Sequence, residues 1–291
     1  MQNRFSTCLL CNHSQLEKLP GYEKDHLFRC ANCGFVFSCI KPSIEELNVA
    51  YSSYARDNQI SEITIKRYND LLDEFEGYRN TNNIIDVGCG DGWFLVEAKK
   101  RGWSVFGTEF EERAVVNGGA KGIIMHQGVL KPSNYSVTFD IITSFEVVEH
   151  INNPMEEFKN FYSILRPGGL VYVTTPNFNS LSRKLLGPKW NVLNYPEHLS
   201  YYTPGTLRFA FKKSGLKLRR QTTSGFSFSR YKDSKTKKKS TGKVYNKNTD
   251  ENIREKMESS KLLNFAKGLV NGLFHITGTG DTIKSSFVKP E

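Results

Sequence analysis

The stretch D-V-G-C-G-D-G, residues 86–92, begins inside the short strand expected at 84–87 and continues into a glycine-rich turn. A Gly-x-Gly turn at the end of a buried strand lets the backbone approach a ligand closely, at the edge where open α/β sheets bind their ligands. The G-x-G-x-x-G fingerprint of dinucleotide-binding proteins is absent, because Trp93 stands where the third glycine would be. Two acidic side chains, Asp86 and Asp91, favour a cationic ligand over a pyrophosphate. The stretch therefore predicts a cofactor-binding loop of acidic character.

Strand-like and helix-like segments alternate around this loop. We expect strands at 84–87, 104–108, 122–125, 140–145, 170–174, 216–222 and 282–288, and helices at 93–101, 111–118, 154–165 and 203–214. Regular alternation of this kind favours a parallel sheet with right-handed crossovers. The predicted fold class is therefore α/β, with a doubly wound and mostly parallel sheet.

An acidic residue ends the second expected strand. This residue is Glu109, 23 residues after Asp86. A carboxylate at this point is well placed to accept hydrogen bonds from ribose hydroxyls. The spacing therefore favours a ligand that contains a nucleoside.

Four motifs together resemble those of class I S-adenosylmethionine-dependent methyltransferases. They are D-V-G-C-G-D-G at 86–92, Glu109 at a strand end, F-D-I-I-T-S-F with E-V-V-E-H at 139–150, and L-R-P-G-G-L-V-Y-V-T-T-P at 165–176. The resemblance covers about residues 80–222. It implies a seven-stranded Rossmann-like methyltransferase sheet and S-adenosyl-L-methionine as the cofactor.

The resemblance also implies the cofactor contacts. Gly88 and Gly90 would pack against the methionine part, while Glu109 would bind the ribose and Phe110 would lie against the adenine. Where the family often has an acidic residue near the adenine amino group, this sequence reads Gln127-Gly128-Val129, so a contact from Val129 would be made by its backbone. The predicted cofactor-binding residues are Asp86, Gly88, Gly90, Glu109, Phe110 and Glu146.

The motif E-V-V-E-H brings Glu146, Glu149 and His150 to the end of the fourth expected strand. It resembles the metal-binding motif of small-RNA terminal 2′-O-methyltransferases and polyprenyl-quinone O-methyltransferases, in which such residues hold a divalent ion. Carboxylate and imidazole ligands would suit Mg²⁺ or Mn²⁺. Two alternatives stay open: the side chains line an acceptor pocket without a metal, or they only cap the following helix.

A second histidine site, Tyr195-Pro-Glu-His198, follows the fifth expected strand. Both sites lie beyond strand carboxyl ends, so we expect them to face one crevice. The stretch resembles one in zinc-ribbon-bearing methyltransferases of nucleotide-linked deoxysugars, in which the histidine is a candidate base. A histidine suits general-base catalysis near neutral pH. The predicted catalytic residues are His198, His150 and Glu149; a hydrogen-bonded structural role for His198 is the alternative.

Four of the six cysteines form two Cys-x-x-Cys pairs, Cys8 with Cys11 and Cys30 with Cys33, separated by 18 residues. This spacing matches a four-thiolate zinc site, and zinc is favoured over disulfides in a cytosolic chain. A unit this small depends on its metal for stability. Because cysteine fills all four positions, we expect a structural Zn²⁺ and no zinc catalysis.

Five segments are expected along the chain. They are a zinc ribbon at 1–40, a helical linker and cofactor or substrate lid at 41–80, a methyltransferase core at 81–228, a basic flexible insertion at 229–260, and a helix with the last strand of the core sheet at 261–291. The formal net charge is +10, and much of it lies in the insertion. Such a run could meet nucleic acid, but its few aromatic residues favour a solvated loop. The apolar helix near 262–274 is expected to pack on the sheet.

The predicted reaction is methyl transfer to a small polar acceptor, most simply O-methylation of a sugar or surface-glycan precursor in polysaccharide biosynthesis. Three alternatives stay open: an enzyme like the RNA 2′-O-methyltransferases that uses a divalent metal, a deoxysugar C-methyltransferase, and a non-catalytic binding module. We do not expect the large C-terminal domain of the deoxysugar enzymes in this chain, which counts against the C-methyltransferase alternative. No apolar run reaches the roughly 18 residues of a spanning helix, and no signal peptide is evident, which predicts a cytoplasmic protein. The oligomeric state stays open.

Overall fold

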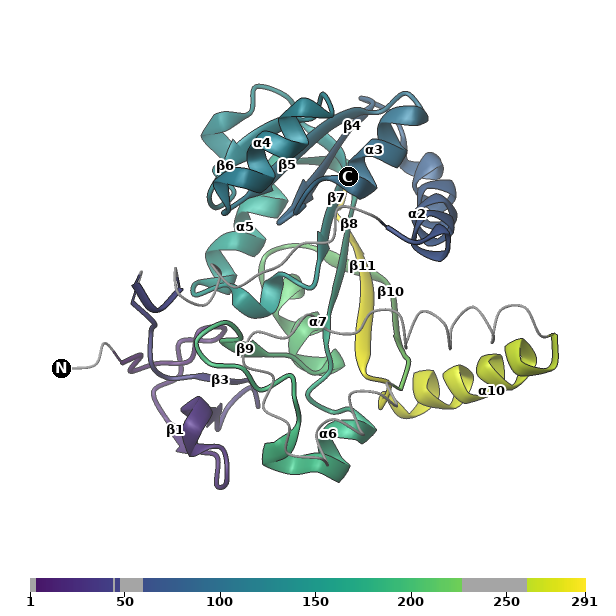
Figure 1. Cartoon of the computed structure of the whole chain (residues 1–291). Coiled ribbons are helices and arrows are strands. Elements are labelled where there is room, and N and C mark those ends of the chain that lie inside the picture. Colours follow the sequence, from purple (N-terminus) through teal and green to yellow (C-terminus); the bar gives the residue numbers. More distant parts are fainter. Residues whose placement is uncertain (1–3, 44, 48–59, 227–260) are drawn as a thin grey trace.

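A central seven-stranded sheet carries helices on both faces, and a four-stranded sheet lies beside it in the computed structural model (Figure 1). The structure describes residues 4–43, 45–47, 60–226 and 261–291, with side chains in the last helix described from Gly268 onward. The basic insertion expected at 229–260 lies outside these residues, as do residues 48–59 of the expected lid.

The large sheet has the strand order β10-β11-β8-β7-β4-β5-β6. Its parallel strands are β4 (Asn83–Val87), β5 (Ser104–Glu109), β6 (Ile124–Gln127), β7 (Phe139–Phe145) and β8 (Leu165–Pro176). Strand β11 (Thr282–Val288) lies between β8 and β10 (Lys217–Ser224) and is antiparallel to both. The predicted doubly wound, mostly parallel α/β sheet is therefore confirmed.

The described helices are α2 (Glu62–Phe75), α3 (Trp93–Lys100), α4 (Glu112–Ala120), α5 (Pro154–Ile164), α6 (Leu181–Leu186), α7 (Pro204–Lys213) and α10 (Lys261–Thr277). Helices α3, α4, α5 and α7 lie close to the expected positions, α2 covers only part of the helical segment expected at 41–80, and α6 was not expected. Short 3-10 turns are η1 (Glu23–Asp25), η2 (Glu76–Tyr78), η3 (Pro132–Asn134), η4 (Val148–His150) and η5 (Gly187–Lys189). The central strand β7 is buried along 139–144, as expected for a parallel strand covered on both faces.

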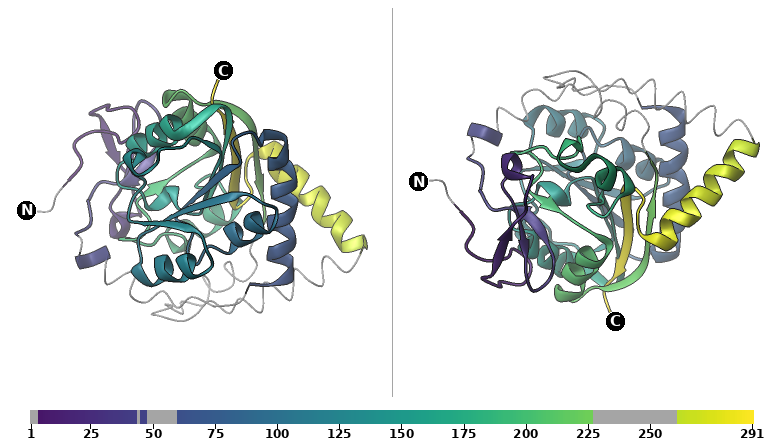
Figure 2. Two further views of the ribbon diagram at one scale, coloured as in Figure 1. Left: turned by 90° about the horizontal axis from the view of Figure 1, so that it is seen from above. Right: turned by 90° about the horizontal axis from the view of Figure 1, so that it is seen from below.

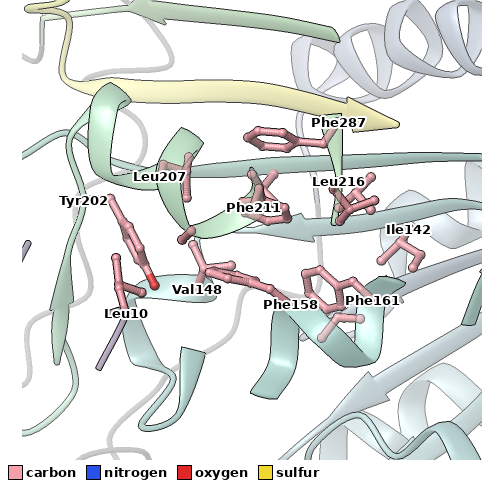
Figure 3. Packing of buried hydrophobic residues seen from close by; sticks show 14 of the residues in the cluster. Leu10, Ile142, Val148, Phe158, Phe161, Tyr202, Leu207, Phe211, Leu216 and Phe287 are labelled. Carbon is pink, nitrogen blue, oxygen red and sulfur yellow. The ribbon is translucent and has the colours of Figure 1, made fainter. Parts of the chain in front are cut away.

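The core between the sheet and helices α5 and α7 is built from aromatic side chains (Figure 3). Phe158 stacks on Phe211 with 4.2 Å between ring centroids. Phe211 in turn stacks on Phe287 of β11 at 4.1 Å. These rings fix α5 and α7 on the sheet, and both helices follow segments that carry predicted site residues.

The small sheet has the order β1-β2-β3-β9 and is antiparallel throughout. Its strands are β1 (Leu16–Lys18), β2 (Leu27–Cys30), β3 (Val36–Ser38) and β9 (Ser200–Tyr201). The first three strands come from the cysteine-rich segment, whereas β9 comes from the region after β8. The two parts of the chain therefore share one sheet.

Two local expectations differ from the structure. The strand expected at 170–174 begins earlier, as β8, because Phe139 pairs with Leu165 before a shift of register and pairing resumes at Ile141 with Leu170. The strand expected at 122–125 begins two residues later, as β6.

The helix near 262–274 was expected to pack its apolar face on the sheet, and this is wrong for most of the described side chains. Phe274 is buried, but Leu269, Leu273 and Ile276 are 63%, 60% and 83% exposed. Figure 2 shows α10 projecting from the body of the molecule. Among the described helices, none has the length and apolar character needed to cross a bilayer.

Candidate functional site

The loop after β4 is shaped by glycines in the left-handed region. Gly88 has φ +73° and Gly90 has φ +55°. A Cβ built on Gly88 would lie 2.5 Å from Cγ2 of Val147. Only glycine fits this position, so the loop runs directly against the E-V-V-E-H motif.

Glu109, at the end of β5, binds this loop. The N–H of Gly90 donates to Glu109 Oε2 at 2.9 Å, and the N–H of Phe110 donates to Oε1 at 2.8 Å. The carboxylate therefore lies at the loop and fixes its backbone, and the ribose contact predicted for Glu109 stays a prediction. The side chain of Phe110, the next residue, is 52% exposed.

The two acidic residues of the loop have different surroundings. Asp86 is buried and accepts a hydrogen bond from Thr143 Oγ1 at 2.8 Å. Burial raises the pKa of Asp86 to about 7, and the bond from Thr143 opposes this rise. Asp91 accepts from Nδ2 of Asn117 at 3.0 Å, so it holds the loop to α4. Both carboxyl groups predicted for the loop are therefore held by hydrogen bonds, Asp86 within the sheet and Asp91 at α4.

The E-V-V-E-H motif begins with an unusual backbone conformation. Glu146 has φ +54°, in the left-handed region that residues other than glycine seldom adopt. Its N–H donates to the carbonyl oxygen of Thr174 at 2.9 Å, which fixes the turn after β7. Strained residues of this kind cluster at functional sites. The turn continues through Val147 into η4, beside the cofactor loop.

Three predicted site residues come together beyond the ends of β7 and β8. Single ligand atoms of Glu149, His150 and His198 lie within 4.8 Å of one another. The two imidazole rings meet edge to face, with 4.6 Å between centroids. The structure therefore brings the two histidine sites, 48 residues apart, into one cluster.

Backbone carbonyls orient both imidazoles. Nδ1 of His198 lies 2.7 Å from the carbonyl oxygen of Val192, and Nδ1 of His150 lies 2.9 Å from that of Glu197. A carbonyl accepts only from a protonated nitrogen, so Nδ1 of His198 carries the proton and Nε2 carries the lone pair. Burial lowers the pKa of His150, and hydrogen bonds with the carbonyls of Glu197 and Glu146 oppose this. Both rings are therefore held in place by the backbone of residues 192–197.

Glu149 supplies a buried carboxylate to this cluster. It is 2% exposed, and Thr175 Oγ1 donates to its Oε2 at 2.9 Å. The carbonyl oxygen of Glu149 also accepts from the N–H of Leu199 at 2.8 Å, which links η4 to the segment that carries His198. Glu149, His150 and His198 form what we call the acceptor cluster.

A model of the family described as a methyltransferase domain matches residues 55–221, more than half of the chain. The chain belongs to this family. The prediction of a class I S-adenosylmethionine-dependent methyltransferase is confirmed.

The curated relatives of this methyltransferase include ubiquinone biosynthesis O-methyltransferases. The one from Acinetobacter baylyi is 24% identical over 169 residues, which are 52% of this chain and 70% of the relative. The one from Cereibacter sphaeroides is 26% identical over 155 residues, which are 49% of this chain and 61% of the relative. The chain thus spans less than two thirds of the second relative.

The fold of the methyltransferase also occurs in solved structures. A SAM-dependent methyltransferase from Archaeoglobus fulgidus has a TM-score of 0.51 and 19% sequence identity, covering 78% of this chain and 94% of that one. A putative sarcosine dimethylglycine methyltransferase from Galdieria sulphuraria has a TM-score of 0.50 and 16% identity, covering 78% and 84%. These likenesses show the fold.

The four cysteines predicted to hold zinc lie together in the methyltransferase. Their sulfur atoms are within 4.8 Å of one another, with 3.5 Å between Cys8 and Cys33 and 3.5 Å between Cys11 and Cys30. A tetrahedral zinc with sulfurs at about 2.3 Å would place them roughly 3.8 Å apart. All four are free of disulfides. The thiols therefore fit a zinc ion, which stays a prediction.

Two threonines of the methyltransferase site were missed in the sequence. Thr143 donates to Asp86, and Thr175 donates to Glu149. Both hydroxyls lie inside strands that read as apolar runs, and a hydroxyl in a buried strand needs a polar partner. That requirement was the signal available in the sequence. Val147, which contacts the position of Gly88, gave no signal because any apolar residue suits the motif.

Proposed function

We propose that this methyltransferase transfers a methyl group to a hydroxyl oxygen of a small polar acceptor, with His198 as the general base. One observation carries the proposal: the acceptor cluster lies at the strand ends, in the motif that touches the cofactor loop through Val147 and Gly88. S-adenosylmethionine, when bound, supplies an electrophilic methyl carbon. The fit of the site to this cofactor rests on the left-handed glycine loop and on the carboxylate of Glu109 beside it.

Each residue has a role that follows from its contacts. Nε2 of His198 takes the proton from the acceptor hydroxyl, because Nδ1 donates to Val192 and fixes the tautomer. Glu149, buried beside the ring, stabilises the imidazolium that forms. Glu109 and the loop at Gly88 and Gly90 hold the cofactor. We assign Asp86 and Glu146 to the same crevice, where their carboxyl groups face a sulfonium cation.

The acceptor cluster is also a donor set for a divalent cation. Two imidazoles and one carboxylate suit Mn²⁺ better than Mg²⁺, which prefers oxygen ligands. An ion here would lower the pKa of an acceptor hydroxyl. Three protein ligands leave coordination positions for that hydroxyl. The metal role and the base role use the same three residues, but His198 cannot have both roles, because its Nε2 either binds the ion or accepts the proton.

The class of acceptor divides into two candidates. A sugar or surface-glycan precursor fits a small polar acceptor and the resemblance of Tyr195–His198 to deoxysugar enzymes. A hydroxyl on an aromatic ring is the second candidate, because relatives about a quarter identical are named ubiquinone biosynthesis O-methyltransferases. Both are O-methylations, and both need the same base.

The test is a methyl-transfer screen with sugar nucleotides, dihydroxyphenyl compounds and an RNA oligonucleotide, each with no metal, Mg²⁺ or Mn²⁺. Mass spectrometry of the product locates the new methyl group. We expect His198→Gln to lower turnover by about 10²–10⁴-fold, the usual range for a lost general base. The matched control His275→Gln, on exposed α10, should behave as wild type. Methylation of carbon or nitrogen, or full turnover by His198→Gln, would contradict the proposal.

A further inference from the structure

The cysteine-rich segment is joined to the acceptor side by a strand. Val36 pairs with Tyr201 and Phe37 with Ser200, as β3 meets β9. The N–H of Ser38 extends this pairing, because it donates to the carbonyl oxygen of Leu199 at 2.8 Å. The pairing therefore begins one residue after His198.

A second contact holds the other side of His198. The ring of His26 meets the ring of Tyr195 edge to face, with 4.9 Å between centroids. The carboxyl group of Asp25 accepts a hydrogen bond from the N–H of Tyr195. Residues on both sides of His198 are thus bound by the cysteine-rich segment.

The four cysteines are close in sequence to the residues that make these contacts. Leu10 lies between Cys8 and Cys11, is fully buried, and packs in the same cluster as Val148 and Tyr202 (Figure 3). The second cysteine pair begins at Cys30, which is the last residue of β2, and β2 pairs with β3. The thiols therefore anchor both the strand that meets β9 and an apolar side chain that packs beside η4.

We propose that the four-thiolate module is a positioning device for His198, which sets the orientation of the imidazole through β3–β9 and through Tyr195. When the thiolates hold their ion, β2 and β3 are fixed and the segment 195–199 is clamped from both sides. When they do not, the segment loses the clamp while the cofactor loop, built by β4 and β5, keeps its shape. The meaning of this device for catalysis rests on the proposed function, in which His198 is the base.

The experiment compares Cys33→Ser with Cys39→Ser in the full chain. Cys33 belongs to the thiolate group, and Cys39 is a buried cysteine of the same segment outside it. Three quantities are measured: zinc per chain, the side-chain NMR signals of His198 assigned with His198→Gln, and binding of S-adenosylhomocysteine by calorimetry. We expect Cys33→Ser to lose zinc and the signal of protonated Nδ1, with cofactor affinity changed by less than about twofold. Cys39→Ser should match wild type in all three.

A second variant leaves the thiolates in place. His26→Gly removes the ring that meets Tyr195, and glycine suits the φ of +54° at this position. We expect normal zinc content and a shifted His198 signal. This variant decides the matter if Cys33→Ser does not fold.

An unchanged His198 signal in zinc-free Cys33→Ser, or in His26→Gly, would overturn the positioning role. Loss of cofactor binding together with zinc would also overturn it, because it would show a general structural role. None of these readouts needs an acceptor, so a failed methylation screen would count against the proposed function alone.

Discussion

Val147 occupies the space that a side chain on residue 88 would need, with 2.5 Å between its Cγ2 and a Cβ built on Gly88. The cofactor loop and the acceptor motif are therefore packed against each other, with no room for a methyl group between them. A substitution in the cofactor loop at Gly88 should therefore also displace the acceptor motif at Val147.

Substitution of Gly88 by alanine should weaken cofactor binding. The alanine meets both a positive φ and Val147, a strain of about 1–3 kcal/mol, or roughly 5- to 150-fold in affinity if the loop shifts. Calorimetry with S-adenosylhomocysteine measures the loss. Gly119→Ala is the control, because its Cβ would meet nothing within 4 Å. The double variant with Val147→Ala should recover part of the loss; no recovery would show that the contact with Val147 is unimportant.

The carboxylate of Glu109 is expected to matter for the cofactor as well as for the loop, whose Gly90 and Phe110 donate hydrogen bonds to it. Glu109→Gln keeps the size of the side chain but removes the charge that strengthens hydrogen bonds to ribose, worth about 1.5–3 kcal/mol. Cofactor affinity should fall by roughly 10- to 150-fold. Glu112→Gln, exposed at the start of α4, is the matched control. Equal affinities in the two variants would rule out the ribose contact.

Asp86 gives the stability of the methyltransferase a defined pH dependence. Burial raises its pKa to about 7 in the folded chain, against about 3.9 in an unfolded one. Between these two pKa values the folded state binds more protons than the unfolded state. The contribution of Asp86 to the free energy of unfolding is therefore full below about pH 4 and is lost as the pH rises to about 7.

Denaturant unfolding at several pH values from about 4 to 7 measures this contribution. Asp86→Asn should remove a slope of up to about 1.4 kcal/mol per pH unit, and the exposed Asp70→Asn should not. Burial also raises the pKa of Glu157 to about 7. Glu157 therefore changes the free energy of unfolding with pH in the same direction, and its part of the slope remains in Asp86→Asn. An identical slope in Asp86→Asn and wild type would show that Asp86 ionises normally.

Loss of the Thr175 hydroxyl should affect stability and the acceptor cluster together. Thr175→Val removes the donor to the buried Glu149 and should lower the free energy of unfolding by about 1–3 kcal/mol. It should also weaken binding of Mn²⁺ if the cluster holds that ion, as measured by electron paramagnetic resonance. Thr175→Ser keeps the hydroxyl and serves as the control. Wild-type values in Thr175→Val would mean that the bond contributes nothing.

Much of the fold could be predicted because burial on both faces leaves long apolar runs in sequence. The segment 282–288 was predicted with the bounds that β11 has. The start of β8 was missed, since the segment 166–169 has the composition of a turn while its pairing with β7 continues around it. The two-residue strand β9 was missed because its partner is about 160 residues earlier in the chain, and no local pattern records such a pairing.

The candidate site was predictable as residue types and less so as geometry. Glu149, His150 and His198 were placed at one crevice because parallel strands end at the same edge. Their mutual distances depend on the turn at Glu146, on the carbonyls of Val192 and Glu197, and on Thr175. These are tertiary partners, and a sequence motif does not name them.

The position of β11 between β8 and β10 has a consequence for synthesis of the chain. Residues 282–288 supply the hydrogen bonds that join β10 to the rest of the large sheet. During translation, β10 leaves the ribosome long before these residues do and must wait with both of its edges unpaired in that sheet. Premature termination before residue 282 would therefore release a chain that lacks β11 and whose β10 has no partner in the large sheet, and its exposed β8 edge would invite aggregation.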